Sequence, residues 1–300
     1  MQPPGSKQKG MALVLVLWIL SLMTIMAGSF ALSTQRESAM LRHAHERSRA
    51  IALAEGAIYY AMLMLSIPDP KLQWQADGRP YLWRGKDIPV EVRIQDEGGK
   101  IDLNMAQESS LKTVFRLMGL QEEVGNQLCD ALLDWRDQDE MKRASGAELP
   151  EYEARGLRAL PQNRQFLVMD EVQGVLGMNP ALYRRLQAWF TLYSMSDGLD
   201  PAKASLEVLT TLLGGNQPAA QSLIQQRTTG LPITIPPVPG LNFSQSGAAA
   251  YTVTAEVLID EDQYFGITAS IRRGATSNAL PFTILRWRPY HRPSRSSSEL

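Results

Sequence analysis

The chain has 300 residues, of which 20% are charged, and its formal net charge is −1. This near-neutral balance gives no electrostatic reason to expect nucleic acid as the main ligand. The single cysteine, Cys129, excludes an intramolecular disulfide, and we expect it to be a small buried hydrophobe in a helix over 122–135.

The most informative segment is the apolar run Met11–Leu32, which directly follows a short basic leader ending in Lys9 and Gly10. At about 1.5 Å per residue, this run spans a hydrocarbon core of roughly 30 Å. No proline interrupts the chain between Met11 and Pro68. We therefore expect one helix of about 55 residues that begins in a membrane and ends outside it.

Three interpretations of this N-terminus compete. A secretory signal peptide could be cleaved at Ser29-Phe30-Ala31, but the apolar run is too long and the helical pattern continues beyond it. A plain single-pass anchor fits the length. A leader of the type IV prepilin kind, cut after Gly10 so that Met11 becomes the new N-terminus, fits the order of residues best. Lysines before the span and arginines after it leave the orientation undecided by charge.

Residues 33–65 continue the helix outside the membrane. From residue 50 an apolar stripe recurs at every third or fourth position, and we expect it to pack on the protein's own soluble domain. The stripe comprises Ala50, Leu53, Ala54, Ala57, Ile58, Ala61, Met62 and Leu65.

Alternating apolar and polar residues over 88–94 predict a strand, and the turn at 96–99 should return the chain as a second, paired strand over 100–104. From Gln107 the period becomes helical. The expected helices are Leu111–Met118, Glu122–Trp135, Glu151–Ala154, Met169–Leu176, Pro180–Leu192, Lys203–Leu213 and Ala219–Arg227.

A proline-rich connection over 232–239 ends the helical block, and a period of two returns after Gly247. It predicts strands over 251–259 and 265–271 around a turn at 260–263, then a third strand over 282–288. We expect a disordered tail over 291–300. Strands on both sides of a helical block of more than a hundred residues indicate an α+β fold with an inserted helical domain.

These pieces together resemble the general secretion pathway protein K family, the minor pseudopilins of bacterial type II secretion systems. The leader Lys9-Gly10, the apolar run from Met11, the segment 96–104 (DEGGKIDLN) and the large helical insert carry the resemblance. The acidic segment 134–139 (DWRDQD), followed by Gly146-Ala147-Glu148, resembles the acidic stretch of that family.

The resemblance implies a single-pass protein of the bacterial inner membrane with most of its chain in the periplasm. It implies cleavage after Gly10 by prepilin peptidase and N-methylation of Met11. The protein would lie at the tip of the pseudopilus with the minor pseudopilins I and J and with other pseudopilins. There it would initiate or cap assembly for the export of folded proteins across the outer membrane.

The fold implied is a pilin-like long N-terminal helix, half transmembrane and half amphipathic, packed on a small antiparallel sheet with an all-helical insert. The expected division is a leader at 1–10, a transmembrane half-helix at 11–32, a first pilin-like part at 33–105, the helical insert at 106–245, a second pilin-like part at 246–290 and the tail at 291–300.

One departure from the general pilin pattern supports the tip position. Pilin-like proteins commonly have a glutamate five residues after the cleavage glycine, where this chain has Leu15. A carboxylate within the hydrocarbon costs about 2.5–3.5 kcal/mol unless it has a partner. A subunit with no neighbour above it has no such partner, so leucine costs less. The alternative is that Leu15 is one more apolar residue of a plain anchor.

The acidic segment is the candidate metal site. Calcium binds 6–8 oxygen ligands, which clustered carboxylates can supply. The candidate ligands are Asp134, Asp137, Asp139 and Glu148. The spacing is not that of an EF-hand, and Leu149 stands where the family often has another acid. A solvated acidic loop, countered by Lys142 and Arg143, is the alternative.

The sequence offers no support for catalysis, and we expect a structural protein. Its three histidines, His43, His45 and His291, lie on the juxtamembrane helix and in the tail, so neither a histidine-based triad nor a zinc site is expected.

A membrane-anchored DNA-uptake protein is the alternative function. The turn Leu117-Met118-Gly119-Leu120 resembles that of a helix-hairpin-helix module, which holds DNA phosphates on backbone N–H groups. The next helix begins with Gln121-Glu122-Glu123, however, whose acids would repel phosphate, so a packing turn is favoured.

Overall fold

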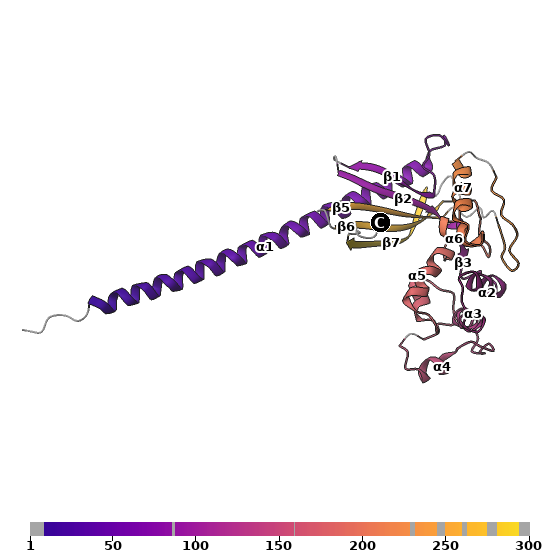
Figure 1. Cartoon of the computed structure of the whole chain (residues 1–300), viewed down its shortest axis with the longest axis horizontal. Helices are drawn as coiled ribbons and strands as arrows, with labels where there is room; N and C mark the ends of the chain where they lie inside the picture. The colour runs from indigo at the N-terminus through magenta and orange to yellow at the C-terminus, as the bar shows by residue number, and fades with distance from the viewer. Residues whose placement is uncertain are drawn as a thin grey trace, which may run out of the picture.

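The computed structural model describes residues 9–85, 88–158, 160–228, 232–244, 250–259, 263–274 and 281–293. A single long helix leads into a sheet, and a group of short helices lies at the end of the sheet that is remote from the N-terminus (Figure 1). Residues 1–8 of the predicted leader and residues 294–300 of the predicted tail lie outside the described residues.

The long helix α1 (Lys9–Ser66) has 58 residues and is unbroken from the leader through the apolar run into the soluble part. At about 1.5 Å per residue it is roughly 87 Å long. It ends two residues before Pro68, as expected, because proline removes a backbone donor and clashes with the preceding turn. The helix also continues through residues 29–31, where a signal peptide would have been cleaved.

Five antiparallel strands form the sheet on which α1 packs. They are β1 (Asp77–Gly85), β2 (Ile88–Asp96), β5 (Ala250–Ile259), β6 (Gln263–Arg273) and β7 (Phe282–Pro293), in the order β1-β2-β5-β6-β7. The register pairs Val92 with Ala255 and Ala255 with Ile267, so two distant stretches of sequence form one sheet. The α+β fold with a pilin-like helix and a helical insert is confirmed.

The stripe predicted on α1 faces this sheet. Ala50, Ala54, Ala57, Ile58, Ala61 and Leu65 are buried, and Leu53 and Met62 are half-buried against the same cluster. The sheet contributes alternate residues of its central strands, among them Val92, Val253 and Ile267. Small side chains on the helix allow its axis to lie close to the strands.

The strand predicted over 100–104 does not pair back on β2. Residues Glu97–Gly99 form a short 3-10 helix, η1, instead of a hairpin turn, and the Asp96 side chain accepts a hydrogen bond from the Gly98 N–H at 2.8 Å. The chain then enters the helical insert, where β3 (Ile101–Asp102) pairs in parallel with β4 (Phe190–Thr191). The two strands are therefore parts of different units.

Three further expectations need correction. The first strand of the sheet, β1, was not predicted, because Gly78 and Pro80 interrupt its alternation. The helix expected over 180–192 ends at Trp189, since the next two residues form β4. The last strand continues to Pro293, so the residues from His291 onward begin as strand rather than as a disordered tail.

Short helices make up the insert, close to the positions expected. They are α2 (Glu108–Leu117), α3 (Glu122–Arg136), α4 (Leu149–Ala154), the 3-10 helix η2 (Met169–Gly174), α5 (Pro180–Trp189), α6 (Leu206–Leu212) and α7 (Gln217–Thr228). Local caps explain several starts. The Asn179 side chain accepts from the Leu182 N–H at 2.9 Å, and Pro180 occupies the first turn of α5.

The insert has its own hydrophobic core, separate from the core between α1 and the sheet. Its buried residues run from Ile101 to Leu241 and include the large side chains of Phe115, Trp135 and Trp189. Trp135 stacks on Phe166 with ring centroids 6.2 Å apart.

Candidate functional site

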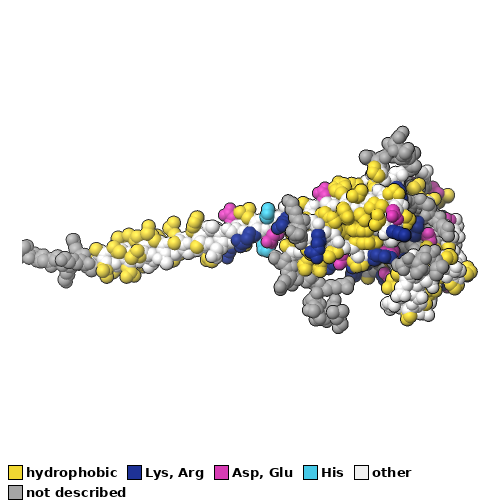
Figure 2. Space-filling model, turned by 90° about the horizontal axis from the view of Figure 1, so that it is seen from above, with side chains coloured by type: hydrophobic (Ala, Val, Ile, Leu, Met, Phe, Trp, Pro, Cys, Tyr) yellow, Lys and Arg dark blue, Asp and Glu magenta, His cyan; other side chains and the backbone are white. Residues whose placement is uncertain are grey.

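The outer half of α1 exposes an apolar surface that no other part of the described chain covers. None of its most apolar stretch is buried within the structure. Within the described residues, α1 is the one helix that is both long enough and apolar enough to cross a membrane. Figure 2 shows hydrophobic side chains along this part of the rod and a band of charged and histidine side chains where it meets the globular part. Such a surface marks contact with lipid or with other apolar helices.

Leu15 lies on this exposed stretch, with 61% of its surface accessible. No acidic residue occurs between Met11 and Arg36. The candidate processing residues Gly10 and Met11 lie in the first turn of α1, which begins at Lys9. The helix that would remain after cleavage is therefore already continuous with the soluble part.

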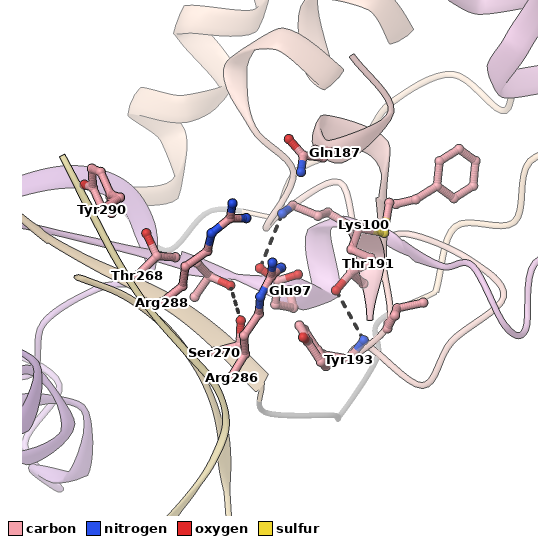
Figure 3. A pocket seen from close by; sticks show the side chains of 14 residues that line it. Glu97, Lys100, Gln187, Thr191, Tyr193, Thr268, Ser270, Arg286, Arg288 and Tyr290 are labelled. Carbon is pink, nitrogen blue, oxygen red and sulfur yellow. Dashed lines mark hydrogen bonds and ion pairs between the residues drawn. The ribbon is translucent and has the colours of Figure 1, made fainter. Parts of the chain in front are cut away.

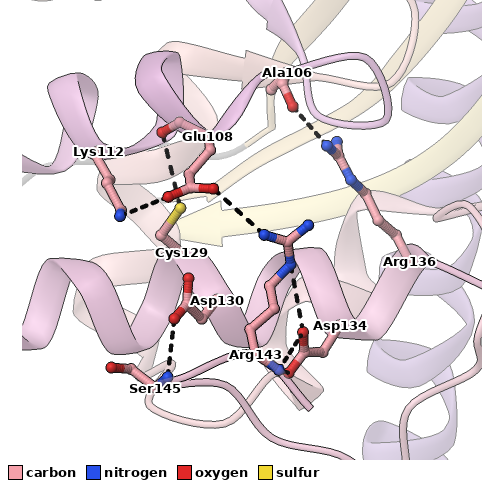
Figure 4. A network of polar contacts seen from close by, with 9 residues as sticks. All are labelled: Ala106, Glu108, Lys112, Cys129, Asp130, Asp134, Arg136, Arg143 and Ser145. Atoms are coloured by element: carbon pink, nitrogen blue, oxygen red, sulfur yellow. Dashed lines mark hydrogen bonds and ion pairs between the residues drawn. The ribbon is translucent and has the colours of Figure 1, made fainter. Parts of the chain in front are cut away.

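The four acidic candidate ligands surround the loop that joins α3 to α4. Asp134, in the last turns of α3, is fully buried, and its carboxylate accepts a hydrogen bond from the Arg143 N–H at 3.2 Å (Figure 4). The Arg143 guanidinium lies 3.6 Å away. Glu148, at the start of α4, is only 4% exposed.

These carboxyl groups are electrostatically coupled. Burial, together with the charge of Asp137, raises the pKa of Asp134 to about 6. Burial and then the negative charges of Asp134 and Asp137 raise the pKa of Glu148 to about 7. Asp139 and Glu140 add to the same effect on Glu148. The arrangement therefore concentrates negative charge without compensating it fully.

Two oxygens in this acidic loop are buried without a hydrogen-bond partner, Glu148 Oε1 and Asp137 Oδ1. Buried carboxylate oxygens normally have partners, so both are available to a cation. Within the described ranges, however, no three acidic, histidine or cysteine side chains converge as metal ligands. Gly146 fits closely in the loop, since a Cβ there would lie 1.9 Å from Asp134 Oδ2.

The turn after α2 resembles a helix-hairpin-helix module in sequence only. Gly119 has a φ of 78°, and its N–H donates to the Arg116 carbonyl at 2.9 Å. The Leu120 N–H donates to the Phe115 carbonyl at 3.0 Å. These two bonds form a Schellman motif that closes α2, so both amides are used within the fold. The packing turn favoured from the sequence agrees with this geometry.

Cys129 is buried, as expected, and burial raises its thiol pKa to about 12. A thiol of this kind is unreactive at neutral pH.

A cleft between the sheet and the insert was not anticipated from the sequence. Its walls come from β5, β6 and β7 on one side and from residues 97–100 and 187–193 on the other. Asp170 of η2 pairs with Arg286 of β7 at 2.7 Å across this junction. No short-range pattern links positions so far apart, so no sequence signal could have found the pair.

Comparison with known proteins gives a family match that includes the first part of the helical insert. The family model for type II secretion system (T2SS) protein K matches residues 94–195. The chain is 27% identical to type II secretion system protein K of Pseudomonas aeruginosa over 73% of this chain and 72% of that protein. It is 30% identical to protein K of Pectobacterium carotovorum subsp. carotovorum over 60% and 62% of the two chains.

The fold is similar to a chain in the crystal structure of the GspK-GspI-GspJ complex from enterotoxigenic Escherichia coli. The TM-score is 0.58 with 16% sequence identity, over 85% of this chain and 99% of that one. The family match, the relatives and the shared fold agree with the resemblance seen in the sequence. The chain is therefore similar to protein K of type II secretion systems, in residues 94–195 by the family model and over most of its length by its relatives and its fold.

Proposed function

We propose that this protein is the minor pseudopilin at the tip of the type II secretion pseudopilus, where it initiates or caps assembly for the export of folded proteins. The similarity to protein K supports the role in secretion. That family is a structural component of the secretion system and is not known as a class of enzyme. The observation that carries the tip position is the insert, a second globular core beyond the sheet at the end remote from the N-terminus (Figure 1), and Leu15 adds to it.

The assembly surface is α1. An exposed apolar helix followed by an alanine-lined half can pack beside other such helices, first in lipid and then in a filament. We propose the minor pseudopilins I and J as the partners, because the structurally similar chain comes from a complex of those three subunits. Co-purification of the three subunits from membranes tests this partnership. Recovery of the full chain without I and J would contradict it.

Processing is the second part of the proposal. Prepilin peptidase would cut after Gly10, and Met11 would be N-methylated, leaving a single-pass inner-membrane protein with most of its chain in the periplasm. The order of basic leader, glycine and uninterrupted apolar helix supports this. Mass analysis of the membrane-extracted protein should give an N-terminus at methylated Met11. A start at Met1 or within 30–33 would contradict the proposal.

Leu15 supports the absence of a subunit above this one. Leu15→Glu would place a carboxylate in lipid at a cost of about 2.5–3.5 kcal/mol on insertion scales. If the protein is always at the tip, the variant should assemble less well than the parent, since no neighbour neutralises the acid. Leu17→Glu, also exposed on α1, is the matched control. Wild-type or better assembly of Leu15→Glu alone would show that another subunit lies above it.

Calcium is the ligand that we propose for the acidic loop formed by Asp134, Asp137, Asp139 and Glu148. Its oxygen-only donors, two of them buried without a partner, have the chemistry that Ca²⁺ prefers. A bound cation would also offset the mutual repulsion that raises the carboxyl pKa values. The Arg143 guanidinium, 3.6 Å from Asp134, would have to turn away.

Titration calorimetry of Ca²⁺ into the full chain in detergent micelles tests the calcium proposal. Asp137→Asn should weaken binding, and Glu153→Gln, an exposed neighbour in α4, should not. No heat and no rise in melting temperature at millimolar Ca²⁺ would exclude the site.

A further inference from the structure

The cleft between the sheet and the helical insert has the size of a ligand pocket. Its volume is about 430 Å³, within the roughly 300–1,000 Å³ of typical small-molecule sites. It lies on the face of the sheet opposite α1. Val253 and Ala269 point toward α1, so Thr252 and Ser270, next to them along their strands, line the cleft.

Three cationic side chains from both walls meet in the cleft. Arg286 and Arg288 come from β7, and Lys100 comes from the segment that leads into the insert. Figure 3 shows their nitrogen atoms directed into the space between the two walls. Converging cations on two sides of a concave surface attract a negatively charged group.

Two acids partly neutralise these cations. Glu97, which is 2% exposed, holds Lys100 at 3.3 Å, and Asp170 holds Arg286 at 2.7 Å. Arg288 lies 3.6 Å from Asp170, with 62% of its side chain accessible. These five groups carry one excess positive charge. A guanidinium has five N–H donors, so Asp170 leaves donor capacity on both arginines.

The rest of the lining suits a small polar head on a short apolar stem. Thr191, Thr252, Thr268 and Ser270 contribute hydroxyl-bearing side chains to the lining, and Met169, Phe190 and Leu192 contribute apolar ones. A singly charged carboxylate neutralises the one excess charge, whereas a doubly charged phosphate would leave a net negative charge beside Glu97 and Asp170. An arginine pair also matches the planar shape of a carboxylate.

We propose that this cleft binds a carboxylate side chain, glutamate or aspartate, presented by an extended segment of a partner protein. β7 is an edge strand of the sheet, and the side chain of Arg288 on it is largely accessible, so a segment of chain can reach the cleft from this side. The recognition is by charge and shape and requires no covalent step.

Fluorescence anisotropy on the full chain in detergent micelles tests this proposal. The probe is a labelled hexapeptide of glycine and serine with one central glutamate and a capped C-terminus. We expect it to bind at least about tenfold more tightly than the matched glutamine peptide. Raising the salt concentration should weaken the binding, since the cations are partly exposed.

Arg288→Gln should weaken binding of the glutamate peptide about fivefold or more, because it removes the most accessible cation. Arg93→Gln is the matched control, as Arg93 is an exposed arginine of the same sheet paired with Glu91 at 2.7 Å. Equal amide exchange in both variants shows that folding is intact. Arg288 is mostly exposed, so its replacement should leave the fold unchanged.

Several outcomes would overturn the proposal. Equal binding of the glutamate and glutamine peptides, or of Arg288→Gln and Arg93→Gln, would exclude recognition of the carboxylate by this cleft. Competition by inorganic phosphate as strong as that by the peptide would show a general anion site. Glutarate competing as well as the peptide would show that the occupant is a free dicarboxylate and not a protein segment. No binding at about 5 mM peptide would exclude the site altogether.

Discussion

The two cores of this molecule are built from different side chains and do different things. Between α1 and the sheet, the helix contributes Ala50, Ala54, Ala57 and Ala61, so helix and strands lie close together. In the insert, large side chains such as Phe115, Trp135 and Trp189 fill a thicker core between short helices. Because the core between α1 and the sheet is thin, the soluble half of α1 stays close to the sheet, and the whole helix forms a rod that can lie beside other such helices. The thicker core of the insert forms the globular end of the molecule.

The cores also differ in charge. The described sheet strands bury one acid, Asp96 at the end of β2, whereas the insert buries Asp134 and Glu148 beside its core. A buried carboxylate costs stability unless it is paired or protonated. The difference indicates that the core between α1 and the sheet depends on apolar packing, while the stability of the insert also depends on the charge state of its buried acids.

The largest effect is expected from removing one of the largest side chains of the insert core, which tests whether the two cores are independent. Trp135→Ala should destabilise the insert by about 3–5 kcal/mol, through lost burial and the cavity left behind. Hydrogen exchange of the full chain in micelles should show faster exchange over 101–241, with little change in β5 and β6. Loss of protection in both regions to the same extent would show that the two cores unfold as one.

The second largest effect is a dependence of stability on pH, and it should be larger in the insert than in the sheet. In the metal-free protein, burial raises the pKa of Asp134 to about 6 and that of Glu148 to about 7, against ordinary values of 3.8 and 4.5. The folded insert then binds protons more tightly than the unfolded chain, so its stability falls as pH rises from about 4 to about 7 and is constant above that. The loss is on the order of 3 kcal/mol for each of the two carboxyl groups, at about 1.36 kcal/mol per pKa unit.

Amide exchange in EDTA at pH 5.5 and pH 7.5, corrected for the intrinsic rate, measures this dependence. Glu148→Gln should reduce it, and saturating Ca²⁺ should reduce it as well under the proposed calcium site. A dependence of the same size in the sheet would assign it to other groups.

A smaller effect is expected from enlarging the thin core. Ala57→Leu should cost about 1–3 kcal/mol, because a fully buried alanine in close contact with strands has no room for three more carbon atoms. The loss should appear in α1 beyond residue 50 and in β5. Glu55→Leu, on the exposed side of the same turn, is the control. Unchanged exchange in β5 of Ala57→Leu would mean that the helix can move away from the sheet.

The sequence predicts the elements that are fixed by local pattern. The span of α1 follows from apolar composition and from the absence of proline before Pro68, and its buried face follows from the three-to-four spacing of alanines. The helices of the insert follow for the same reason. The acidic residues near α3 could also be identified, because they are close together in the chain.

The sequence does not predict which strands pair when the two strands are far apart in the chain. The segment 100–104 has the pattern of the return strand of a hairpin, yet Ile101 pairs with Phe190, 89 residues further along the chain. No local rule distinguishes these two partners, because both satisfy the same backbone hydrogen bonds. The cleft and the Asp170–Arg286 pair are unpredictable for the same reason, since they depend on where the insert rests against the sheet.

The contact between the two cores gives the smallest and most specific prediction. Asp170→Asn should remove the ion pair to Arg286 but keep an acceptor for the Tyr183 hydroxyl, which donates to Asp170 Oδ1 at 2.8 Å. Both charged partners are partly exposed, so the cost should be about 1 kcal/mol or less.

Glu91→Gln, which breaks a pair within the sheet, should cost a similar amount without affecting the insert. If Asp170→Asn increases exchange on both sides of the junction while Glu91→Gln affects the sheet alone, the ion pair couples the rod to its globular end. Identical profiles for the two variants would mean that the two units meet without coupling.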